Sequence, residues 1–220
     1  MDLIPREFFD RPSDEVAPAL LGCVLEHETD EGLVAVELTE VEAYAGETDP
    51  ASHSYRGRTA RNAVMFGPPG YAYVYFTYGM HFCVNVTCMP EGIPRAVLMR
   101  AGRVIAGEPL ARRRRAQWRA EAGPRDAIPA RDLARGPARL CQALAVDRTQ
   151  NGVDLCSGAS ELRMRPADTG PRPAGETEIA VGPRVGVSAA ADVPWRFWIA
   201  GDPTVSPYRP HKSRTRSPLP

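Results

Sequence analysis

The chain has 220 residues, of which 43% are apolar, and its formal net charge is zero. This length and composition fit one large domain or two small ones with a substantial core. A zero net charge argues against a strongly basic protein that coats nucleic acid without specificity. No apolar run is long enough to span a bilayer, and the N-terminal sequence MDLIPREFFDRPSDE lacks the apolar segment of a signal peptide. We therefore expect a soluble, cytoplasmic protein with no membrane contact.

Hydrophobic periodicity predicts a protein built mainly from strands. The N-terminal part favours a short helix that contains Pro18 and leads into a strand at Leu21–Glu26. Further strands are expected at 33–44, 71–77, 81–87 and 96–101, and helices at 107–122 and 138–146. Two more strands lie in GETEIAVGPRVGV and PWRFWIAG, and the tail from Val205 on is predicted to be disordered. Neighbouring strands joined by a hairpin indicate an antiparallel sheet with helices to one side, which is the α+β class.

The cysteines and basic residues restrict the chemistry. The five cysteines form no CxxC pair, which is typical of buried thiols in a cytoplasmic protein. A zinc site through Cys83 and Cys88 would lack a second pair of ligands. Arginines cluster at Arg112–Arg119 and Arg56–Arg61, and Lys212 is the only lysine of the chain. An arginine excess can reflect genomic base composition alone, so it is not taken as a sign of function.

The stretch YAYVYFTYGMHFCVN, residues 71–85, concentrates four of the seven tyrosines. In a strand, Tyr71, Tyr73 and Tyr75 would share one face, because successive side chains alternate. Gly79 supplies the backbone freedom for a tight turn, which would place Tyr78 at the tip of a β-hairpin. For any single tyrosine the ordinary explanation is favoured, with Tyr73 and Tyr75 as packing residues and Tyr78 as an exposed turn residue.

A second group of polar residues follows an apolar strand. Glu40, Glu42 and Tyr44 are spaced two apart, so they would project from one face near the end of the strand at 33–44. His53 follows in a loop. A carboxylate, a tyrosine and a histidine close together suit the activation of water beside an aromatic pocket. A solvent-exposed strand end followed by a polar loop explains the same pattern equally well.

These residues carry a resemblance to a known family. The stretch VEAYAGETDPASHSYRGRTARNAVMFGPPGYAYVYFTYGMHFCVNV, followed by EGIPRAVLMRAG and GPARLCQALAVDR, resembles the 3-methyladenine DNA glycosylases of the alkyladenine (methylpurine) DNA glycosylase family. The match runs from EFFDRP to FWIAGDP. It implies a single α+β domain over residues 1–204, with a curved antiparallel sheet, flanking helices and a protruding β-hairpin, before a disordered tail at 205–220. It also implies that no metal or redox cofactor is needed.

The resemblance assigns a catalytic role to three positions. Glu42 matches the general base, while Arg100 and the main chain at Val185 match groups that hold the attacking water with it. After Arg100 the chain reads Ala101-Gly102-Arg103, where the family leads us to expect an acidic residue and a proline.

The resemblance also assigns residues that bind DNA. Tyr44, His53 and Tyr75 match residues that line the pocket for the extruded base, and Asn85 matches the residue that crowds the 2-amino group of guanine. Tyr78 matches the hairpin-tip residue that enters the DNA stack. A planar side chain there would replace part of the stacking lost when a base is flipped out.

The implied function is that of a monofunctional DNA glycosylase of base excision repair. It would bind double-stranded DNA as a monomer, excise alkylated purines, with deaminated purines as further candidate substrates, and leave an abasic site; in a bacterium it would associate with the nucleoid. A lyase would need an amine, and Lys212 lies in the predicted tail. The same residues would also fit a non-catalytic lesion-binding protein or a small-molecule nucleosidase. The lesion preference, and whether His53 protonates the leaving base, stay open.

Overall fold

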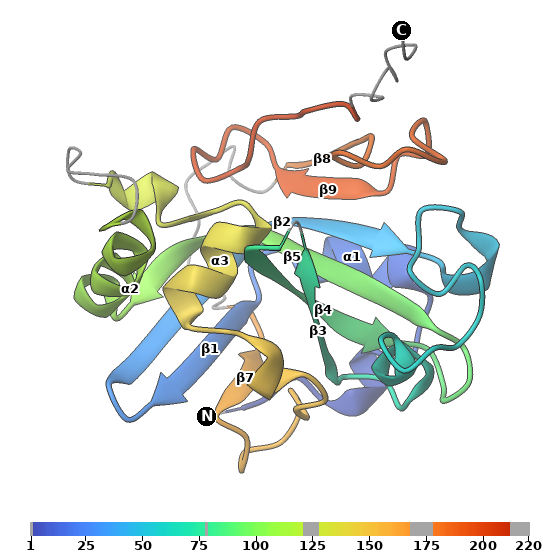
Figure 1. Cartoon of the computed structure of the whole chain (residues 1–220), viewed down its shortest axis with the longest axis horizontal. Coiled ribbons are helices and arrows are strands. Elements are labelled where there is room, and N and C mark those ends of the chain that lie inside the picture. Colours follow the sequence, from blue (N-terminus) through green and yellow to red (C-terminus); the bar gives the residue numbers. More distant parts are fainter. Residues whose placement is uncertain (1, 78, 121–127, 168–177, 212–220) are drawn as a thin grey trace, which may run out of the picture.

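An antiparallel sheet organises the chain, as the computed structural model shows for residues 2–77, 79–120, 128–167 and 178–211 (Figure 1). Within these residues, nine strands and three α-helices form a single α+β domain, which confirms the predicted class. The strands are β1 (Val24–Thr29), β2 (Gly32–Tyr44), β3 (Ala72–Thr77), β4 (His81–Cys88), β5 (Arg95–Ala106), β6 (Ala134–Arg135), β7 (Leu162–Arg165), β8 (Ile179–Gly182) and β9 (Arg196–Ile199). The helices are α1 (Ser13–Ala19), α2 (Glu108–Ala120) and α3 (Pro137–Leu144).

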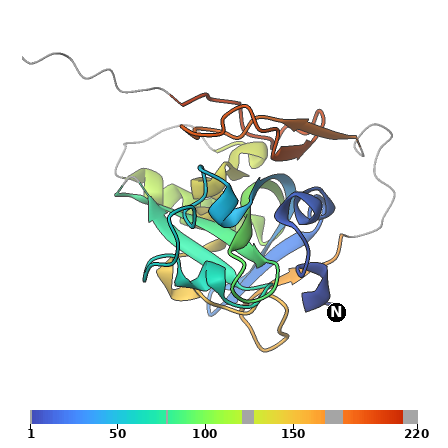
Figure 2. The same ribbon diagram turned by 90° about the vertical axis from the view of Figure 1, so that its right-hand side faces the viewer.

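The long strand β2 lies at the centre of the sheet and changes its neighbour along its length. The strand order is β3-β4-β5-β2-β1-β7, with β6 added to β5. β1 pairs with β2 as far as Glu37, whereas β9 pairs with it from Glu40 to Glu42 and carries β8 on its other side. In Figures 1 and 2 the β8–β9 pair therefore stands apart from the β1–β7 branch.

One large apolar cluster forms the main core. All three helices contribute to it, and so do alternate residues of the strands β1 to β5. Helix α3 begins with Pro137 at its first turn, where a missing N–H costs nothing, and buries its apolar side on the core. On β3, Ala72 and Val74 face this core, so Tyr73 and Tyr75 must face the other side of the sheet.

The pairing of β2 with β5 has three register shifts, of which two flank Glu40, and the first of these two decides which side chains of β2 face the core. Leu38 pairs with Gly102 and Glu40 with Ala101, so Thr39 is an extra residue in β2. Because a bulge shifts the alternation by one residue, Val34, Val36 and Leu38 are core residues before it and Val41 and Ala43 after it. Glu40 and Glu42 consequently point away from the core.

The second bulge lies on β5. Glu40 pairs with Ala101 and Val41 with Met99, so Arg100 is the extra residue there. Next to it, Gly102 lies so close to the main chain of Glu37 and the side chain of Val36 that there is no room for a Cβ atom. The unexpected sequence Ala101-Gly102 thus fits the close approach of the two bulged strands.

The arginines of α2 serve the fold in large part. Arg112 bonds Glu108 one turn earlier at 2.7 Å, and Arg114 donates to Glu31 of the β1–β2 turn at 3.1 Å. Arg115 bonds Gln142 of α3. Within the part of α2 whose side chains are described, Arg113 is the exposed member of the run. The role of this cluster, which the sequence leaves open, therefore includes holding α2 to the rest of the domain.

Several element boundaries differ from the predicted ones. β1 begins at Val24 and not at Leu21, because Leu20–Cys23 form a turn in which Gly22 has a positive φ. β5 continues to Ala106, and the short strands β6 and β7 were not predicted. Tyr78 lies outside the described residues, so the protruding hairpin stays a prediction. Among the described residues, no helix is long and apolar enough to cross a membrane.

The start of the predicted tail contacts the domain. Val205 accepts a hydrogen bond from Arg135, and Ser206 is buried and bonds Glu40. Disorder is therefore the wrong description for Val205 and Ser206, because both are bonded to the sheet. Residues 212–220 lie outside the described residues, and the domain boundary at 204 stays a prediction.

Candidate active site

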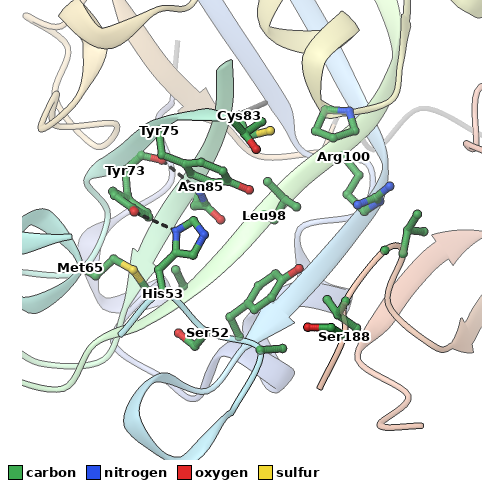
Figure 3. A pocket seen from close by; sticks show the side chains of 18 of the residues that line it. Ser52, His53, Met65, Tyr73, Tyr75, Cys83, Asn85, Leu98, Arg100 and Ser188 are labelled. Atoms are coloured by element: carbon green, nitrogen blue, oxygen red, sulfur yellow. Dashed lines mark hydrogen bonds between the residues drawn. The ribbon is translucent and has the colours of Figure 1, made fainter. Parts of the chain in front are cut away.

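A cavity of about 430 Å³ opens on the face of the sheet opposite the main core (Figure 3). Its walls come from β2, β3, β4 and β5, from the loop that contains His53, and from the segment after β8. The residues that line it include Tyr44, Ser52, His53, Met65, Tyr73, Tyr75, Thr77, Cys83, Asn85, Leu98, Arg100, Val185 and Ser188. Four elements that are adjacent in the sheet thus place their outward-facing side chains in one hollow.

Three aromatic rings form one wall of the cavity. The rings of Tyr73 and Tyr75 stack with centroids 5.6 Å apart, and the ring of His53 meets Tyr75 edge-on at 4.5 Å. His53 Nδ1 shares a hydrogen bond of 2.9 Å with the hydroxyl of Tyr73, which is 1% exposed. The buried Tyr73 therefore fixes the orientation of the exposed His53 (Figure 3).

The base of the cavity lies on β4 and β5. Asn85 pairs with Tyr73 on one side and with Leu98 on the other, and its side-chain amide donates to the carbonyl oxygen of Tyr73 at 3.1 Å. Cys83 faces the cavity, whereas Cys88 packs in the main core. Because these two thiols lie on opposite faces of the sheet, they do not make the zinc pair considered from the sequence.

The aromatic wall is uncharged at neutral pH. Burial raises the pKa of Tyr73 to about 12, and burial together with the neighbouring Cys83 raises the pKa of Tyr75 well above its usual value. The pKa of His53 is lowered, first by partial removal of its ring from water and then by the positive charge of Arg61. A neutral imidazole and two phenols therefore face the space in which a ligand would lie.

On the β2 side of the cavity lies a buried carboxylate, Glu42, which is 0% exposed. The main-chain N–H of Val185 donates to Oε1 at 2.7 Å, the hydroxyl of Tyr44 donates to Oε2 at 2.9 Å, and Arg100 Nη1 lies 3.1 Å from Oε2. Each carboxylate oxygen has two lone pairs. The second lone pair of Oε1 is thus the acceptor position that these three donors do not use.

Glu42 does not itself line the cavity. Its three partners Tyr44, Arg100 and Val185 do, so the carboxylate lies one layer behind the cavity surface. Burial and the negative charge of Glu42 raise the pKa of Tyr44 well above its usual value, so the phenol stays a hydrogen-bond donor. The solvent-exposed strand end considered from the sequence is therefore wrong, because both Glu40 and Glu42 are fully buried.

Glu40 holds the other side of Arg100. Its Oε1 accepts from Arg100 Nε at 2.8 Å, from Arg196 Nε at 2.8 Å and from the hydroxyl of Ser206 at 2.9 Å. Burial acts to raise the pKa of Glu40, but the charges of Arg100 and Arg196 and the bonds from Ser206 outweigh it and lower the pKa. The ionised Glu40 carboxylate is thus an anchor for the guanidinium that contacts Glu42.

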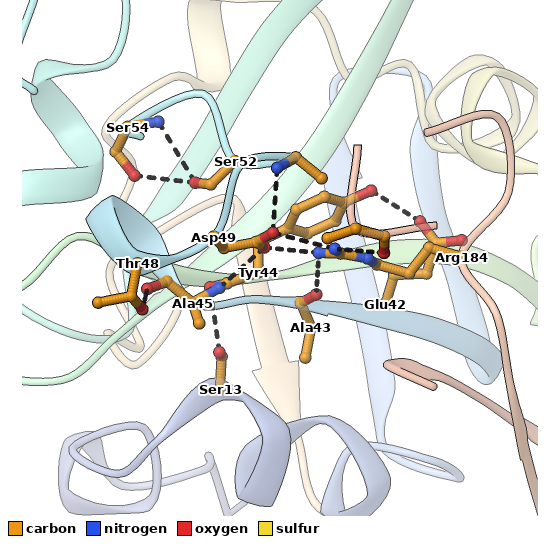
Figure 4. A network of polar contacts seen from close by, with 12 residues as sticks. Ser13, Glu42, Ala43, Tyr44, Ala45, Thr48, Asp49, Ser52, Ser54 and Arg184 are labelled. Atoms are coloured by element: carbon orange, nitrogen blue, oxygen red, sulfur yellow. Dashed lines mark hydrogen bonds and ion pairs between the residues drawn. The ribbon is translucent and has the colours of Figure 1, made fainter. Parts of the chain in front are cut away.

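A third buried ion pair braces the strand end (Figure 4). Arg184 Nη2 donates to Asp49 Oδ1 at 3.0 Å, and Nη1 donates to the carbonyl oxygen of Ala43 at 3.1 Å. The guanidinium also lies 4.8 Å from the centre of the Tyr44 ring and 5.3 Å from that of Trp195. Because Val185 follows Arg184 directly, this pair fixes both the Tyr44 ring and the N–H that holds Glu42.

The buried charges cancel, as burial requires. Three carboxylates and three guanidiniums, each less than a tenth exposed, lie together around the end of β2: Glu40, Glu42, Asp49, Arg100, Arg184 and Arg196.

The structure brings seven of the eight residues that the sequence singled out into one site. Arg100 and Val185 both contact Glu42, and Tyr44, His53, Tyr75 and Asn85 line one cavity. Tyr78 lies outside the described residues. The functional roles of all eight stay predictions.

Sequence reasoning missed further residues of the site, among them Tyr73, Asp49, Arg184 and Arg196. Tyr73 could have been found, because it shares the period of two with Tyr75, but it was interpreted as packing. Asp49 and Arg184 lie 135 positions apart, and no local pattern connects them.

Comparison with known proteins identifies the family. Residues 7–203 match the family model described as "Methylpurine-DNA glycosylase (MPG)". A protein of Streptomyces avermitilis named "Putative 3-methyladenine DNA glycosylase" is 52% identical over 97% of this chain and 95% of its own length. Proteins of the same name from Leifsonia xyli and Burkholderia cenocepacia are 50% and 45% identical, over 94% and 93% of this chain and 92% and 91% of their own lengths.

Proposed function

The chain belongs to the methylpurine-DNA glycosylase family, and we propose that it excises alkylated purines from double-stranded DNA. In this proposal the damaged nucleotide rotates out of the duplex, its base enters the aromatic cavity, and a water activated by Glu42 attacks the sugar. The observation that carries the proposal is the position of Glu42. Its carboxylate is oriented by Arg100, Tyr44 and Val185 directly behind a neutral aromatic cavity.

The cavity suits a flat base. Its volume of about 430 Å³ falls within the range of small-ligand pockets, about 300–1,000 Å³. Stacking of a base on an aromatic side chain is worth about 1–3 kcal/mol. A purine methylated at N3 or N7 is cationic, and the faces of Tyr44 and Tyr75 attract a cation more than a neutral ring. The neutral state of His53 removes a repulsion that an imidazolium would add.

The chemical step follows from the donors around Glu42. The water oxygen forms a bond to C1′ of the sugar, the bond from C1′ to the base nitrogen breaks, and its electron pair leaves with the base. Glu42 accepts the proton of the water and stabilises the positive charge that develops at C1′, as carboxylates do in glycoside hydrolysis. The unused lone pair on Oε1 is the acceptor position for this proton.

A small rearrangement must accompany substrate binding. Because Glu42 is 0% exposed, at least one of the three residues that separate it from the cavity, Tyr44, Arg100 or Val185, has to move for a water to reach Oε1. Hydrogen bonds of catalytic groups commonly tighten or realign only in the substrate complex.

Two further features of the proposal concern selectivity and product. Asn85 lies at the base of the cavity, where its amide would crowd the 2-amino group of a guanine. A cationic base leaves without an acid, whereas hypoxanthine would need a proton that a neutral His53 supplies poorly. Since Lys212 is the only lysine, we expect no Schiff base, and the product is an intact abasic site.

The test is an excision assay on four duplexes, which carry 3-methyladenine, 7-methylguanine, hypoxanthine or ethenoadenine. We expect release of at least one cationic base and strand breakage only after alkali. Binding without excision of any of the four would favour a non-catalytic lesion-binding protein. Breakage without alkali, or a complex trapped by borohydride, would contradict the monofunctional mechanism.

A further inference from the structure

The segment Val205–Arg209, called here the C-terminal segment, touches the catalytic layer at two points. At the first, Ser206 donates from its main-chain N–H to Glu40 Oε2 at 2.7 Å and from its hydroxyl to Glu40 Oε1 at 2.9 Å. Ser206 is 8% exposed and its own carbonyl oxygen accepts from Arg196 at 2.7 Å. One buried residue thus contacts both Glu40 and a second guanidinium partner of Glu40.

The second point lies beside Val185. The main-chain N–H of Gly186 donates to the carbonyl oxygen of Arg209 at 3.0 Å. Gly186 follows Val185, whose own N–H holds Glu42 Oε1. The C-terminal segment therefore touches both supports of Glu42: the Glu40–Arg100 pair on one side and the main chain at Val185 on the other.

We propose that Ser206 is a positioning residue for the general base, acting through Glu40 and Arg100. The inference rests on the proposed role of Glu42 and adds a residue that the excision mechanism does not otherwise use. The connection is continuous: the Ser206 hydroxyl contacts Glu40 Oε1, which accepts from Arg100 Nε, and Nη1 of the same guanidinium contacts Glu42 Oε2.

The rigid shape of a guanidinium explains how the effect is transmitted. Its five N–H groups lie in one plane in a fixed fork. The position of Glu40 at the Nε edge therefore sets where Nη1 points at Glu42. A carboxylate with one donor fewer has more freedom to rotate, and a small misplacement of reacting groups lowers the rate of the chemical step more than it lowers binding.

A residue that only attaches this part of the chain to the domain should affect stability and not the excision rate. Thr204 provides that comparison. Thr204 is also buried, at 3% exposure, and its hydroxyl bonds Asp202 at 2.6 Å and Thr39 at 2.7 Å. It lies two positions before Ser206. Its substitution removes a buried hydroxyl from the same region of the chain, while Glu40 keeps its contacts with Arg100, Arg196 and Ser206.

The experiment compares Ser206→Ala, Ser206→Thr and Thr204→Val in the full chain. Each protein is measured for single-turnover excision of a lesion that the wild type excises, for affinity to the same lesion duplex, and for thermal stability. We expect Ser206→Ala to excise about tenfold more slowly, the order of effect for a hydrogen bond to a charged group. Its affinity should stay within about twofold. Ser206→Thr keeps the hydroxyl and should restore most of the rate, and Thr204→Val should keep the wild-type rate even where it lowers stability.

A further variant keeps the test possible if Ser206→Ala folds poorly. Ser206→Cys has a similar size and a weak S–H donor, so an intermediate rate is expected. Excision by Ser206→Ala or Ser206→Cys at the wild-type rate would overturn the inference, and so would an equal loss in Thr204→Val or the absence of rescue in Ser206→Thr. These results leave the proposed function standing. Wild-type protein that excises none of the four lesions would overturn both.

Discussion

The two layers of the site differ in how they handle charge. The wall formed by His53, Tyr73 and Tyr75 is uncharged and open to a ligand, whereas the layer around Glu42 holds six buried charges that cancel. The wall is built from β3 and a nearby loop. The charged layer joins β2, β5 and β9 to the segment after β8 and to the C-terminal segment. This difference suggests that the wall determines what binds and that the charged layer determines what reacts, a division that substitutions can test.

The largest effect is expected from Glu42→Gln. Glutamine preserves the shape of the side chain but cannot accept the proton of the water, so excision should fall by about 10²–10⁴-fold. Lesion affinity should remain, because Glu42 does not line the cavity. Single-turnover excision and binding to the same duplex measure the two quantities. Excision within about threefold of wild type would show that Glu42 is not the base.

Arg184→Met tests whether the charged layer also supports the fold. It leaves Asp49 buried without its partner, and the loss of one member of a buried ion pair costs about 3–5 kcal/mol. Unfolding in urea should show this loss, with Arg113→Met on the exposed side of α2 as the matched control. Equal stability of the two variants would mean that the Arg184–Asp49 pair is dispensable.

Tyr75→Leu tests the aromatic wall. It removes one stacking face, so the affinity for a lesion duplex should weaken by about 1–3 kcal/mol. The loss should be greater for a cationic base than for a neutral one, because the ring face also attracts positive charge. Stability should change less than in Arg184→Met. An equal loss for 7-methylguanine and ethenoadenine would show that Tyr75 contributes no cation selectivity.

Tyr78→Ala tests the predicted hairpin tip, which in our proposal enters the DNA stack. We expect a loss of about 1–3 kcal/mol in duplex excision and a much smaller one in single-stranded DNA, where little stacking has to be replaced. The same lesion is measured in both contexts. Equal losses would indicate that Tyr78 belongs to the pocket or the fold and does not enter the stack.

The smallest effect concerns the protonation of His53. Its surroundings lower its pKa below the ordinary value of about 6.5, so the folded protein resists this proton more than the unfolded chain does. Protonation of His53 therefore lowers the free energy of unfolding. This part of the stability is fully present above about pH 6.5 and is lost as pH falls from there through the lowered pKa. Protonation should also weaken binding of a cationic base.

A matched variant isolates this effect. The affinity of wild type for a 7-methylguanine duplex should fall relative to His53→Gln only below about pH 6.5, by about tenfold or less because the site is partly screened by solvent. A difference that grows toward high pH would contradict the lowered pKa.

Much of the wall could be predicted from the sequence, because it follows from local periodicity. The alternation in residues 71–85 places Tyr73, Tyr75, Cys83 and Asn85 on one face of a hairpin, and the structure has that register. The resemblance supplied Tyr44 and His53 as well. A period of two is a short-range property, so a single strand suffices to reveal it.

The charged layer could be predicted only in part. The bulge at Thr39 turns Glu40 and Glu42 away from the face that holds Val34, Val36 and Leu38, and alternation alone would have kept all of them on one face. The contacts of Glu40 with Ser206 and of Asp49 with Arg184 join distant parts of the chain. No local pattern marks such contacts, so the start of the C-terminal segment was mistaken for a disordered tail.

The most direct test of the two-layer account is a crystal structure of Glu42→Gln bound to a duplex that carries a cationic methylated purine that the wild type excises. The account predicts that the damaged base lies in the cavity against Tyr75 and His53, with C1′ facing the side chain at position 42 and with a water between them. A base that remains stacked in the duplex, or one held in the cavity with its C1′ turned away from position 42, would contradict it.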